Sequence, residues 1–443
     1  MPQMSRVHAA LVLVAVLTAI AACSGPPSDD AAVDTSKPGA DCFWYGPTFD
    51  IANEKENFAF PDSGAHYWAA QYTLPAGATL TLRGEFAHGR YQSLNTYNTR
   101  TNSPTDALND VSTRADSGST NPFLPGADRT AKDRSYTVTV LDELKPAAEV
   151  PNTLYTKVPG QERTTLLYRL YLPDDGTDET GNVGLPDPAV TLSDGRVVTG
   201  ADVCTIVKSG TSSPAVETVD TSTYAKLRDQ PGRPATFPAQ EDASWRTFYN
   251  VSAMLGCIYQ NVCGPAQRTG GQYSNIDNQY VTTYINRGFG EVLTLTGTMP
   301  KTPATLSGAA TMPTDVDMRY WSLCNNEAIV TTKAIGCVFD EEIPLTDDRT
   351  YTIVASLPEE RPANARAECG VAWLPLSPRG DGGGHHNDGY LLLRNMLPSN
   401  GFHHAAQNTQ VTGDEEAVMG AYLPTSHYGD KAEFEARGCG NQS

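Results

Sequence analysis

Short runs in which apolar and polar residues alternate dominate the chain. Three clear examples are Thr79–Leu82, Tyr136–Val140 and Tyr351–Val354, which are rich in Thr, Val, Tyr and Leu. A period of two in β-branched and aromatic residues is typical of strands that bury one face. Gly, Pro, Asn and Asp separate these runs, as expected of turns. The pattern therefore predicts an all-β protein with only a few short helices.

Four of these predicted strands recur in the same order in the second half of the chain. The first set is Leu80–Gly84, Arg90–Asn95, Asp133–Val138 and Leu166–Pro173, and the second is Leu293–Gly297, Arg319–Cys324, Asp348–Ile353 and Leu391–Pro398. The offsets are 213, 229, 215 and 225 residues, so insertions fall between strands and not within them. Ordered repetition of this kind indicates an internal duplication. We expect two β domains of similar architecture.

The domain boundaries follow from composition. We place the first domain at 41–209 and the second at 241–443. Residues 210–240 contain four prolines and read as a linker with one short helix near Tyr224–Leu227. A further helix is expected at the start of the second domain, because apolar residues from Trp245 to Tyr259 recur near a spacing of 3.6.

The N-terminus predicts export and lipid attachment. Residues 1–22 carry one basic residue, Arg6, and an apolar run too short to cross a bilayer, as in a signal peptide. The following Cys23 stands where a bacterial lipoprotein receives its lipid, and 23–40 reads as a flexible tether. We expect a protein anchored by lipid to the cell membrane and facing the extracytoplasmic side. The alternative is an ordinary secretory signal that happens to precede a cysteine.

The other cysteines fit an oxidising compartment. They are Cys42, Cys204, Cys257, Cys263, Cys324, Cys337, Cys369 and Cys439. An even number of cysteines favours four disulfides, and buried free thiols are the alternative. The chain contains no C-x-x-C pair, so the cysteines do not indicate a zinc site. The duplication favours Cys42–Cys204 and Cys257–Cys439, a hairpin favours Cys324–Cys337, and Cys263–Cys369 remains. The rival for the second bridge is Cys257–Cys263.

Charge and missing motifs exclude several functions. Acidic residues outnumber basic ones by 51 to 32, giving a net charge of −19 that would repel nucleic acid. The chain has no G-x-S-x-G elbow, no phosphate-binding loop, no H-E-x-x-H helix and no dinucleotide fingerprint. No catalytic residue can therefore be named from a motif.

The residues also resemble a known pair of bacterial families. Leu74–Leu82 and Gly89–Leu94 resemble domain-of-unknown-function family twelve-fifty-four, and Arg319–Leu323, Trp373–Pro378 and Tyr390–Pro398 resemble its companion, family twelve-fourteen. The resemblance implies tandem jelly-roll-like β-sandwiches and no established activity. The stretch from Arg379 to Gly389 departs from it as an insertion.

Histidines gather near the C-terminus and suggest a metal. The insertion offers His385, His386 and Asp388, and a second pair, His403 and His404, follows the next predicted strand. Imidazole and carboxylate suit a divalent ion such as Zn²⁺ or Cu²⁺. The two pairs either meet at one end of the sandwich or lie a strand apart. The alternative is a solvent-exposed, glycine-rich hairpin tip.

Arginines recur at matching places, which suggests either architecture or ligand binding. The pairs are Arg90 and Arg319, Arg134 and Arg349, and Arg169 and Arg394. All six could hold strand ends through ion pairs, or Arg169 and Arg394 could project into a ligand cavity and grip an anion or a sugar hydroxyl. The aromatic Trp68 could stack on a sugar ring, with core packing as its alternative.

Together these features favour a binding module of the cell envelope that takes a small molecule, a glycan or another envelope component, without nucleic acid. One alternative is a hydrolase or metal-dependent enzyme with its site around His385, Arg394 and His403. Another is a structural or interaction protein.

Overall fold

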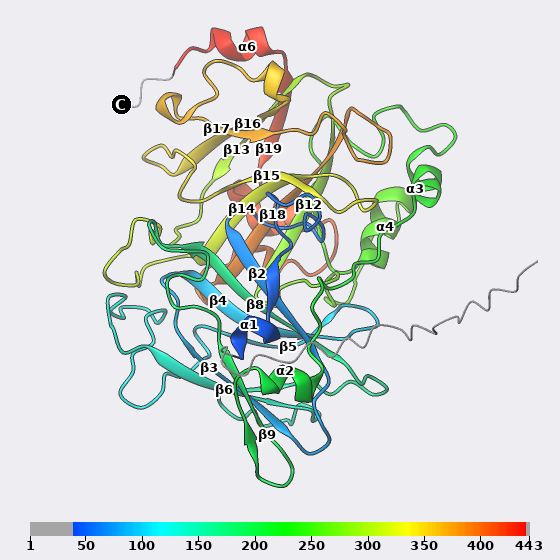
Figure 1. Ribbon diagram of the computed structural model, residues 1–443. Coiled ribbons are helices and arrows are strands. Elements are labelled where there is room, and N and C mark those ends of the chain that lie inside the picture. Colours follow the sequence, from blue (N-terminus) through cyan, green and yellow to red (C-terminus); the bar gives the residue numbers. More distant parts are fainter. Residues whose placement is uncertain (1–38, 440–443) are drawn as a thin grey trace, which may run out of the picture. The chain divides into compact units, whose positions relative to one another are not determined.

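The computed structural model describes residues 39–439, and two β-sheets form its first half (Figure 1). One sheet has the order β1-β2-β8-β4-β5 and the other β10-β9-β3-β6-β7. The strands are β1 (Tyr45–Thr48), β2 (Ala65–Tyr72), β3 (Thr79–Glu85), β4 (Gly89–Tyr97), β5 (Pro104–Asn109), β6 (Ser135–Leu141), β7 (Thr153–Tyr155), β8 (Thr164–Pro173), β9 (Asp187–Thr191) and β10 (Val197–Val198).

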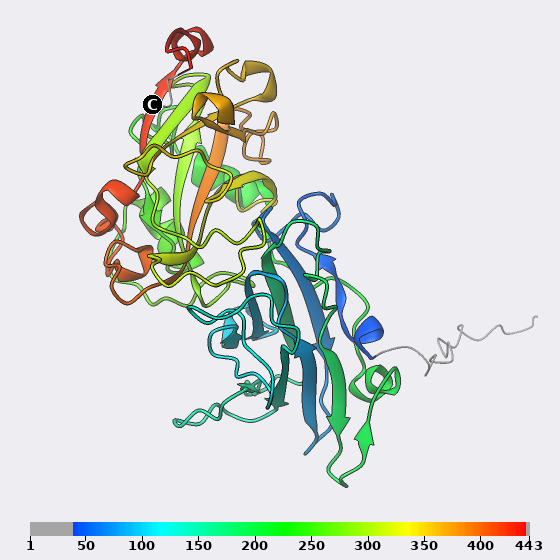
Figure 2. The ribbon, with the colours of Figure 1, turned by 90° about the vertical axis from the view of Figure 1, so that its left-hand side faces the viewer.

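Two more sheets form the second half and repeat this topology. Their orders are β11-β12-β18-β14-β15 and β17-β16-β13-β19. The strands are β11 (Arg246–Thr247), β12 (Asn278–Asn286), β13 (Val292–Thr298), β14 (Met318–Asn326), β15 (Ala334–Phe339), β16 (Thr350–Ser356), β17 (Ala372–Pro375), β18 (Asp388–Pro398) and β19 (Thr425–Gly429). Figure 2 shows the strands of both halves from the side.

The two halves match strand by strand, so the expected duplication is present. Adding ten to a strand number in the first half, from β1 to β9, gives its counterpart in the second, and the edge pairs β6–β7 and β16–β17 are both parallel. All four sequence matches fall on equivalent strands: β3 and β13, β4 and β14, β6 and β16, β8 and β18. The all-β fold of two β-sandwiches with a few short helices is therefore confirmed.

Burial patterns explain how the sandwiches are built. In β6, buried Tyr136, Val138 and Val140 alternate with partly exposed residues, because one face packs in the core and the other meets solvent. The central strands β4, β8, β14 and β18 are instead buried at nearly every position. One face of each packs inside its own sandwich, and part of the other face packs against the opposite half.

Reciprocal ion pairs join the halves. Arg90 donates to Asp340 at 3.0 Å, and its counterpart Arg319 donates to Asp110 at 3.1 Å. Each of these arginines also donates to the carbonyl of the other, at 3.3 and 3.2 Å. A buried tyrosine-rich cluster lies beside them, and the sandwiches form one compact unit. The same surface thus meets its own copy, as in a two-fold symmetric dimer.

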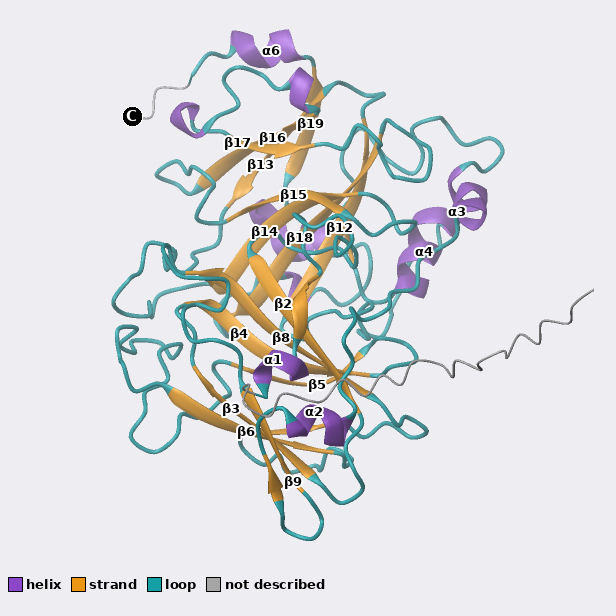
Figure 3. Ribbon diagram, viewed as in Figure 1, coloured by secondary structure: helices purple, strands orange, loops and turns teal. Residues whose placement is uncertain are grey.

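Helices are short, and Figure 3 shows them at the margins of the sheets. They are α1 (Ala40–Phe43), α2 (Asp202–Val207), α3 (Thr221–Arg228), α4 (Val251–Gln260), α5 (Glu415–Met419) and α6 (Lys431–Ala436), with 3₁₀ turns η1 (Pro358–Glu360), η2 (Ala367–Cys369), η3 (Ala406–Asn408) and η4 (Gly420–Tyr422). The expected linker helix is α3. The expected second helix is α4, but it begins at Val251 because extended Asn250 caps it, accepting from the Ala253 N–H at 2.9 Å.

The disulfides confirm part of the expected pairing. Cys42–Cys204 and Cys324–Cys337 are present as predicted. The favoured Cys257–Cys439 and Cys263–Cys369 are wrong, because Cys257 bonds Cys263 and Cys369 bonds Cys439.

The error came from the alignment of the helix that carries Cys257. The indole N–H groups of Trp44 and Trp245 each donate to a proline carbonyl at 2.8 Å, so these tryptophans are equivalent. Helix α4 lies after that point, as an insertion between β11 and β12. Cys257 therefore does not occupy the place of Cys42.

The expected signal peptide at 1–22, the expected lipid site at Cys23 and nearly all of the expected tether at 23–40 lie outside the described residues. Within 39–439, no helix has the length and apolar character needed to span a bilayer.

Candidate functional site

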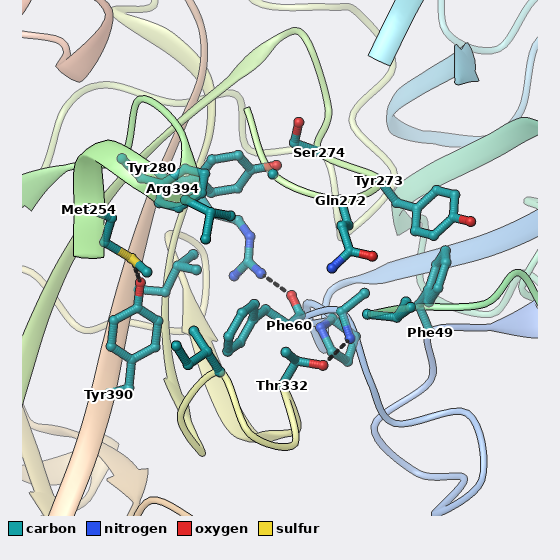
Figure 4. Close-up of a pocket in the computed structure, with 18 of the residues that line it drawn as sticks. Phe49, Phe60, Met254, Gln272, Tyr273, Ser274, Tyr280, Thr332, Tyr390 and Arg394 are labelled. Atoms are coloured by element: carbon teal, nitrogen blue, oxygen red, sulfur yellow. Dashed lines mark hydrogen bonds between the residues drawn. The ribbon is translucent and has the colours of Figure 1, made fainter. Parts of the chain in front are cut away.

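A cavity of about 140 Å³ lies between the two halves (Figure 4). Aromatic side chains form much of its wall, contributed by β2, β8, β12, β18 and the segments before β2 and β12. They are Phe49, Phe60, Tyr67, Tyr171, Phe248, Tyr273, Tyr280 and Tyr390. Two buried arginines, Arg169 and Arg394, add the only cationic groups to the described lining. The predicted arginine pair therefore does reach a cavity.

Arg394 is a buried cation with a carboxylate partner. Its Nη1 lies 3.3 Å from Asp62 and 2.7 Å from the Cys324 sulfur. Its Nη2 donates to the Phe60 carbonyl at 2.6 Å, the contact drawn in Figure 4. Asp62 also accepts from Tyr320 at 2.9 Å and from Ser322 at 2.6 Å, so its oxygens are well satisfied. This half of the site is electrically neutral.

Arg169 has the same surroundings but no carboxylate. It donates to the Asn95 side chain and to the Tyr273 carbonyl, the latter at 2.5 Å. The guanidinium carbon lies 5.8 Å from the ring centre of Tyr67 and 5.6 Å from that of Tyr97. Among residues 39–439, no carboxylate comes within 4.0 Å of it. The cavity thus contains an Arg169 charge that lacks a contacting acid.

Strand register makes the two arginines equivalent. Tyr67 on β2 stands opposite Arg169 on β8, and Ser93 on β4 stands on its other side. In the second half, Tyr280 and Ser322 flank Arg394 in the same way. The strands that carry Tyr67 and Tyr280, β2 and β12, were not among the four pairs matched in the sequence. The place of these tyrosines beside the arginines could not be predicted either, because register across a sheet cannot be read from one strand.

The linker covers part of the cavity. Val216, Glu217 and Val219 line it, and Glu217 is exposed at its rim. The Glu217 N–H donates to Gln272 at 2.8 Å, and the Gln272 amide donates back to the Glu217 carbonyl at 2.6 Å. The Val219 N–H donates to the Ile329 carbonyl at 3.2 Å. A segment expected only to connect domains therefore helps to build the site.

Trp68 does not belong to the cavity. It is 4% exposed and packs in the first sandwich core, with its ring 5.8 Å from that of Tyr168. Successive strand residues point to opposite faces, so Tyr67 lines the cavity while Trp68 points away from it. The core-packing alternative holds for Trp68.

The repeated arginines divide between the two expected roles. Arg90, Arg319 and Arg394 form buried ion pairs, as the architectural alternative predicts. Arg349 instead donates to the carbonyls of Met299 and Pro300, at 2.9 and 2.7 Å. Arg134 donates to the Arg129 carbonyl at 2.7 Å.

The His-rich insertion forms a polar cluster around His385. Its two ring nitrogens lie 2.6 Å from Asp381 and 2.9 Å from Asp229. Ligand atoms of Asp381, His385 and Asp388 lie within 4.8 Å of one another, so they could hold a metal ion. Asp388 already accepts from Arg228 at 2.6 and 3.2 Å, and burial raises its pKa despite that bond. As built, the cluster ties helix α3 to the start of β18.

The other predicted ligands lie elsewhere. His386 is exposed, and its carbonyl accepts from Arg287 at 2.8 Å. His403 and His404 follow the far end of β18, an 11-residue strand of roughly 35 Å. The His404 ring stacks on Tyr422 at 5.4 Å. The two pairs therefore lie a strand apart and cannot share one ion.

Comparisons with known proteins identify no family. No protein-family model and no curated protein matches the chain, so the resemblance to families twelve-fifty-four and twelve-fourteen stays a prediction. Solved structures with some likeness include an uncharacterized protein from Burkholderia cenocepacia, 13% identical, covering 82% of this chain and 80% of that one, with a TM-score of 0.45. Another is the VPA0106 protein from Vibrio parahaemolyticus, 10% identical, covering 84% and 90%, with a TM-score of 0.39. Neither likeness is close enough to bear on function.

Proposed function

We propose that this chain is a binding protein of the bacterial cell envelope, held at the membrane by lipid on Cys23, and that its ligand is a small molecule. The cavity between the sandwiches carries the proposal. It combines apolar and aromatic walls with two buried, fixed cations, which is the usual composition of small-molecule sites. Catalysis is not required, since no nucleophile paired with a general base lines the cavity in residues 39–439.

Export is supported by the cysteines. All eight that follow Cys23 pair in disulfides, a pattern that belongs to oxidising compartments. Such a compartment also fits the signal-like N-terminus. The lipid anchor itself is tested by mass spectrometry of the mature protein, which should show a diacylglyceryl adduct that disappears in Cys23→Ser.

The ligand is sought by native mass spectrometry of the mature chain from Ser24, exported with a conventional signal and purified without detergent. We expect a discrete added mass of a small molecule. Val216→Trp, which places an indole in the cavity, should remove it. Val197→Trp is the matched control, because Val197 is 63% exposed on β10 and outside the cavity. Bare protein in every sample, even after incubation with envelope extract, would contradict the proposal.

A further inference from the structure

We infer that the ligand is a small organic anion, a carboxylate on an apolar body, whose charge pairs with Arg169. The inference rests on the proposed function and adds the chemical class of the ligand. It is drawn from a difference between two copies of the same site within one chain.

Arg169 has an unusual environment for a buried charge. It is 2% exposed, and guanidinium remains protonated in proteins. Buried cations are normally paired with acids, because removing a charge from water is costly. Asn95, the Tyr273 carbonyl and two tyrosine rings partly compensate. These groups are dipoles and ring quadrupoles, and none carries a full negative charge.

The duplicated half shows which group is missing. Asp62 and Asn275 occupy equivalent positions, related by the same 213-residue offset as Tyr67 and Tyr280. The backbone N–H of Asp62 donates to Tyr67 at 3.3 Å, and that of Asn275 donates to Tyr280 at 3.1 Å. Each side chain accepts from the N–H two residues later, at 3.0 and 3.1 Å.

Contacts across the halves agree with this equivalence. Asp62 accepts from the Tyr320 hydroxyl at 2.9 Å, and Asn275 accepts from the equivalent Tyr91 at 3.2 Å. Where Arg394 finds an aspartate, Arg169 therefore faces the position of an asparagine. Asparagine has nearly the same shape as aspartate but carries no negative charge, so the two copies of the site differ mainly in charge.

The nearest displaced acid does not replace it. Asp277 follows Asn275 by two residues, where the first half has Gly64. Its carboxylate accepts from Tyr91 at 2.7 Å and from Asn109 at 3.0 Å, and it is not within 4.0 Å of Arg169. Burial raises the pKa of Asp277, while those hydrogen bonds and the more distant charges of Arg169 and Arg319 lower it. Asp277 does not line the cavity, and Glu217, the one acid of the described lining, is exposed at the rim.

The walls specify the rest of the ligand. Phe49, Phe60 and Tyr273 surround the space, and its volume of about 140 Å³ is close to that of a cavity of roughly 150 Å³ that accepts benzene. Arg394 is paired with Asp62, whereas no described carboxylate contacts Arg169, so the Arg169 guanidinium is the cation that the ligand would pair with. A single carboxylate on a ring-sized apolar body satisfies both features. A small inorganic ion would leave the space between the aromatic side chains empty.

The test compares benzoate with benzamide, which has nearly the same shape and no charge. Both are titrated into the mature chain from Ser24 and followed by ligand-observed NMR. We expect benzoate to bind at least about tenfold more tightly, because only benzoate brings a full negative charge to the buried guanidinium.

The decisive variant combines Asn275→Asp with Asp277→Gly, which copies residues 62 and 64 into the second half. Net charge is unchanged, but a carboxylate is placed where it can pair with Arg169. Benzoate binding should weaken about tenfold or more, and benzamide binding should not. Arg169→Gln is a second variant with the same expected result. Thermal unfolding confirms that each variant is folded.

The alternative outcomes separate the two proposals. Equal binding of benzoate and benzamide, both lost in Val216→Trp, would retain the binding site and overturn the anion. Retained preference for benzoate in the folded double variant or in Arg169→Gln would show that Arg169 does not select the ligand. If neither probe binds the wild-type chain, the inference fails, and the native mass spectra then decide the proposed function separately.

Discussion

At the scale of the residue, the two equivalent arginines show how duplicated sites can differ: Arg394 pairs with Asp62, while Asn275 holds the position equivalent to Asp62 on the side of Arg169. One copy has a buried ion pair, and the other has an uncharged asparagine at the position of the acid. A protein can tolerate this only where the remaining contacts hold the cation, as Asn95 and Tyr273 do for Arg169. Residues that serve binding are often less favourable for the stability of the fold than other residues would be at the same positions.

Removing the acid from the intact pair should therefore be costly. Asp62→Asn leaves Arg394 without a carboxylate, and we expect the free energy of unfolding to fall by at least about 2 kcal/mol. Urea unfolding measures the change. Asp315→Asn is the control, since Asp315 is 88% exposed in its pair with Lys301 and should change stability by less than about 0.5 kcal/mol. Equal effects of the two substitutions would refute the role given to Asp62.

Asp110 should make stability depend on pH. Burial raises its pKa to about 6, although Arg319 opposes the rise. The folded chain then binds a proton more readily than the unfolded chain between pH 4 and pH 6, so this group destabilises the fold as pH rises through that window. Relative to Asp110→Asn, the wild-type protein should gain stability when the pH falls from 7 to 5. A constant difference in urea midpoint at the two pH values would show that the carboxyl is not shifted.

At the scale of the element, the two halves differ mainly in segments inserted between the equivalent strands. Helix α4 and the linker helix α3 have no counterparts in the first half, and the loop before β18 is longer than the equivalent loop before β8. The two helices pack together on one side of the second sandwich. His385, Asp229 and Arg228 join the linker to β18. Because this linker also lines the cavity, its attachment bears on access to the site.

Loosening that attachment should be measurable. His385→Ala removes the contacts to Asp381 and Asp229, and we expect faster hydrogen exchange in α3. His386→Ala is the neighbouring control, because the His386 side chain is exposed and its contact to Arg287 uses the main chain. The same samples test the predicted metal: an ion bound at a fixed ratio and lost only in His385→Ala would support it. Unchanged exchange in α3 would contradict the attachment.

The two disulfides that differ from the favoured pairing give a further test at this scale. A non-reducing peptide map should recover Cys257–Cys263, whose partners are 6 residues apart, and Cys369–Cys439, which joins η2 to the segment after α6. Linkage of Cys257 to Cys439 would contradict the fold around α4. It would instead restore the symmetric pairing that the sequence favoured.

Sequence alone predicted the repeated strands well and the site only in part. Strand patterns and their order are local signals, so β3 and β13 or β8 and β18 could be matched directly. Arg169 and Arg394 were candidates because they repeat. The significance of Asn275 required knowing which residues face each other across the two halves. Trp68 and the pairing of Cys257 were misjudged because strand facing and insertions are settled by tertiary packing.

At the scale of the whole molecule, the two sandwiches act as one body. Their contact buries the reciprocal Arg90–Asp340 and Arg319–Asp110 pairs and a cluster that includes Tyr171 and Tyr320, whose rings lie 5.2 Å apart. These buried side chains come from both halves, so the two sandwiches are packed against each other. The cavity depends on both halves and would be lost if they separated.

Cleavage of the linker tests whether the two sandwiches stay associated without a covalent connection. A protease site inserted at Gly232, where the backbone has a positive φ of 82° and no heavy atom would crowd an added side chain, should be cleaved without loss of structure. The nicked chain, with its disulfides intact, should migrate as one species in size-exclusion chromatography. Each disulfide lies within one half, so separation into two fragments in native buffer would show that the interface is weak.

The most direct test of the account is a crystal structure of the mature chain with 4-bromobenzoate, in which anomalous scattering locates the bromine. The account predicts bromine among the aromatic residues of the cavity and the carboxylate about 2.8 Å from the Arg169 guanidinium. Bromine found only at other places, or an empty cavity at a saturating concentration of the compound, would contradict it.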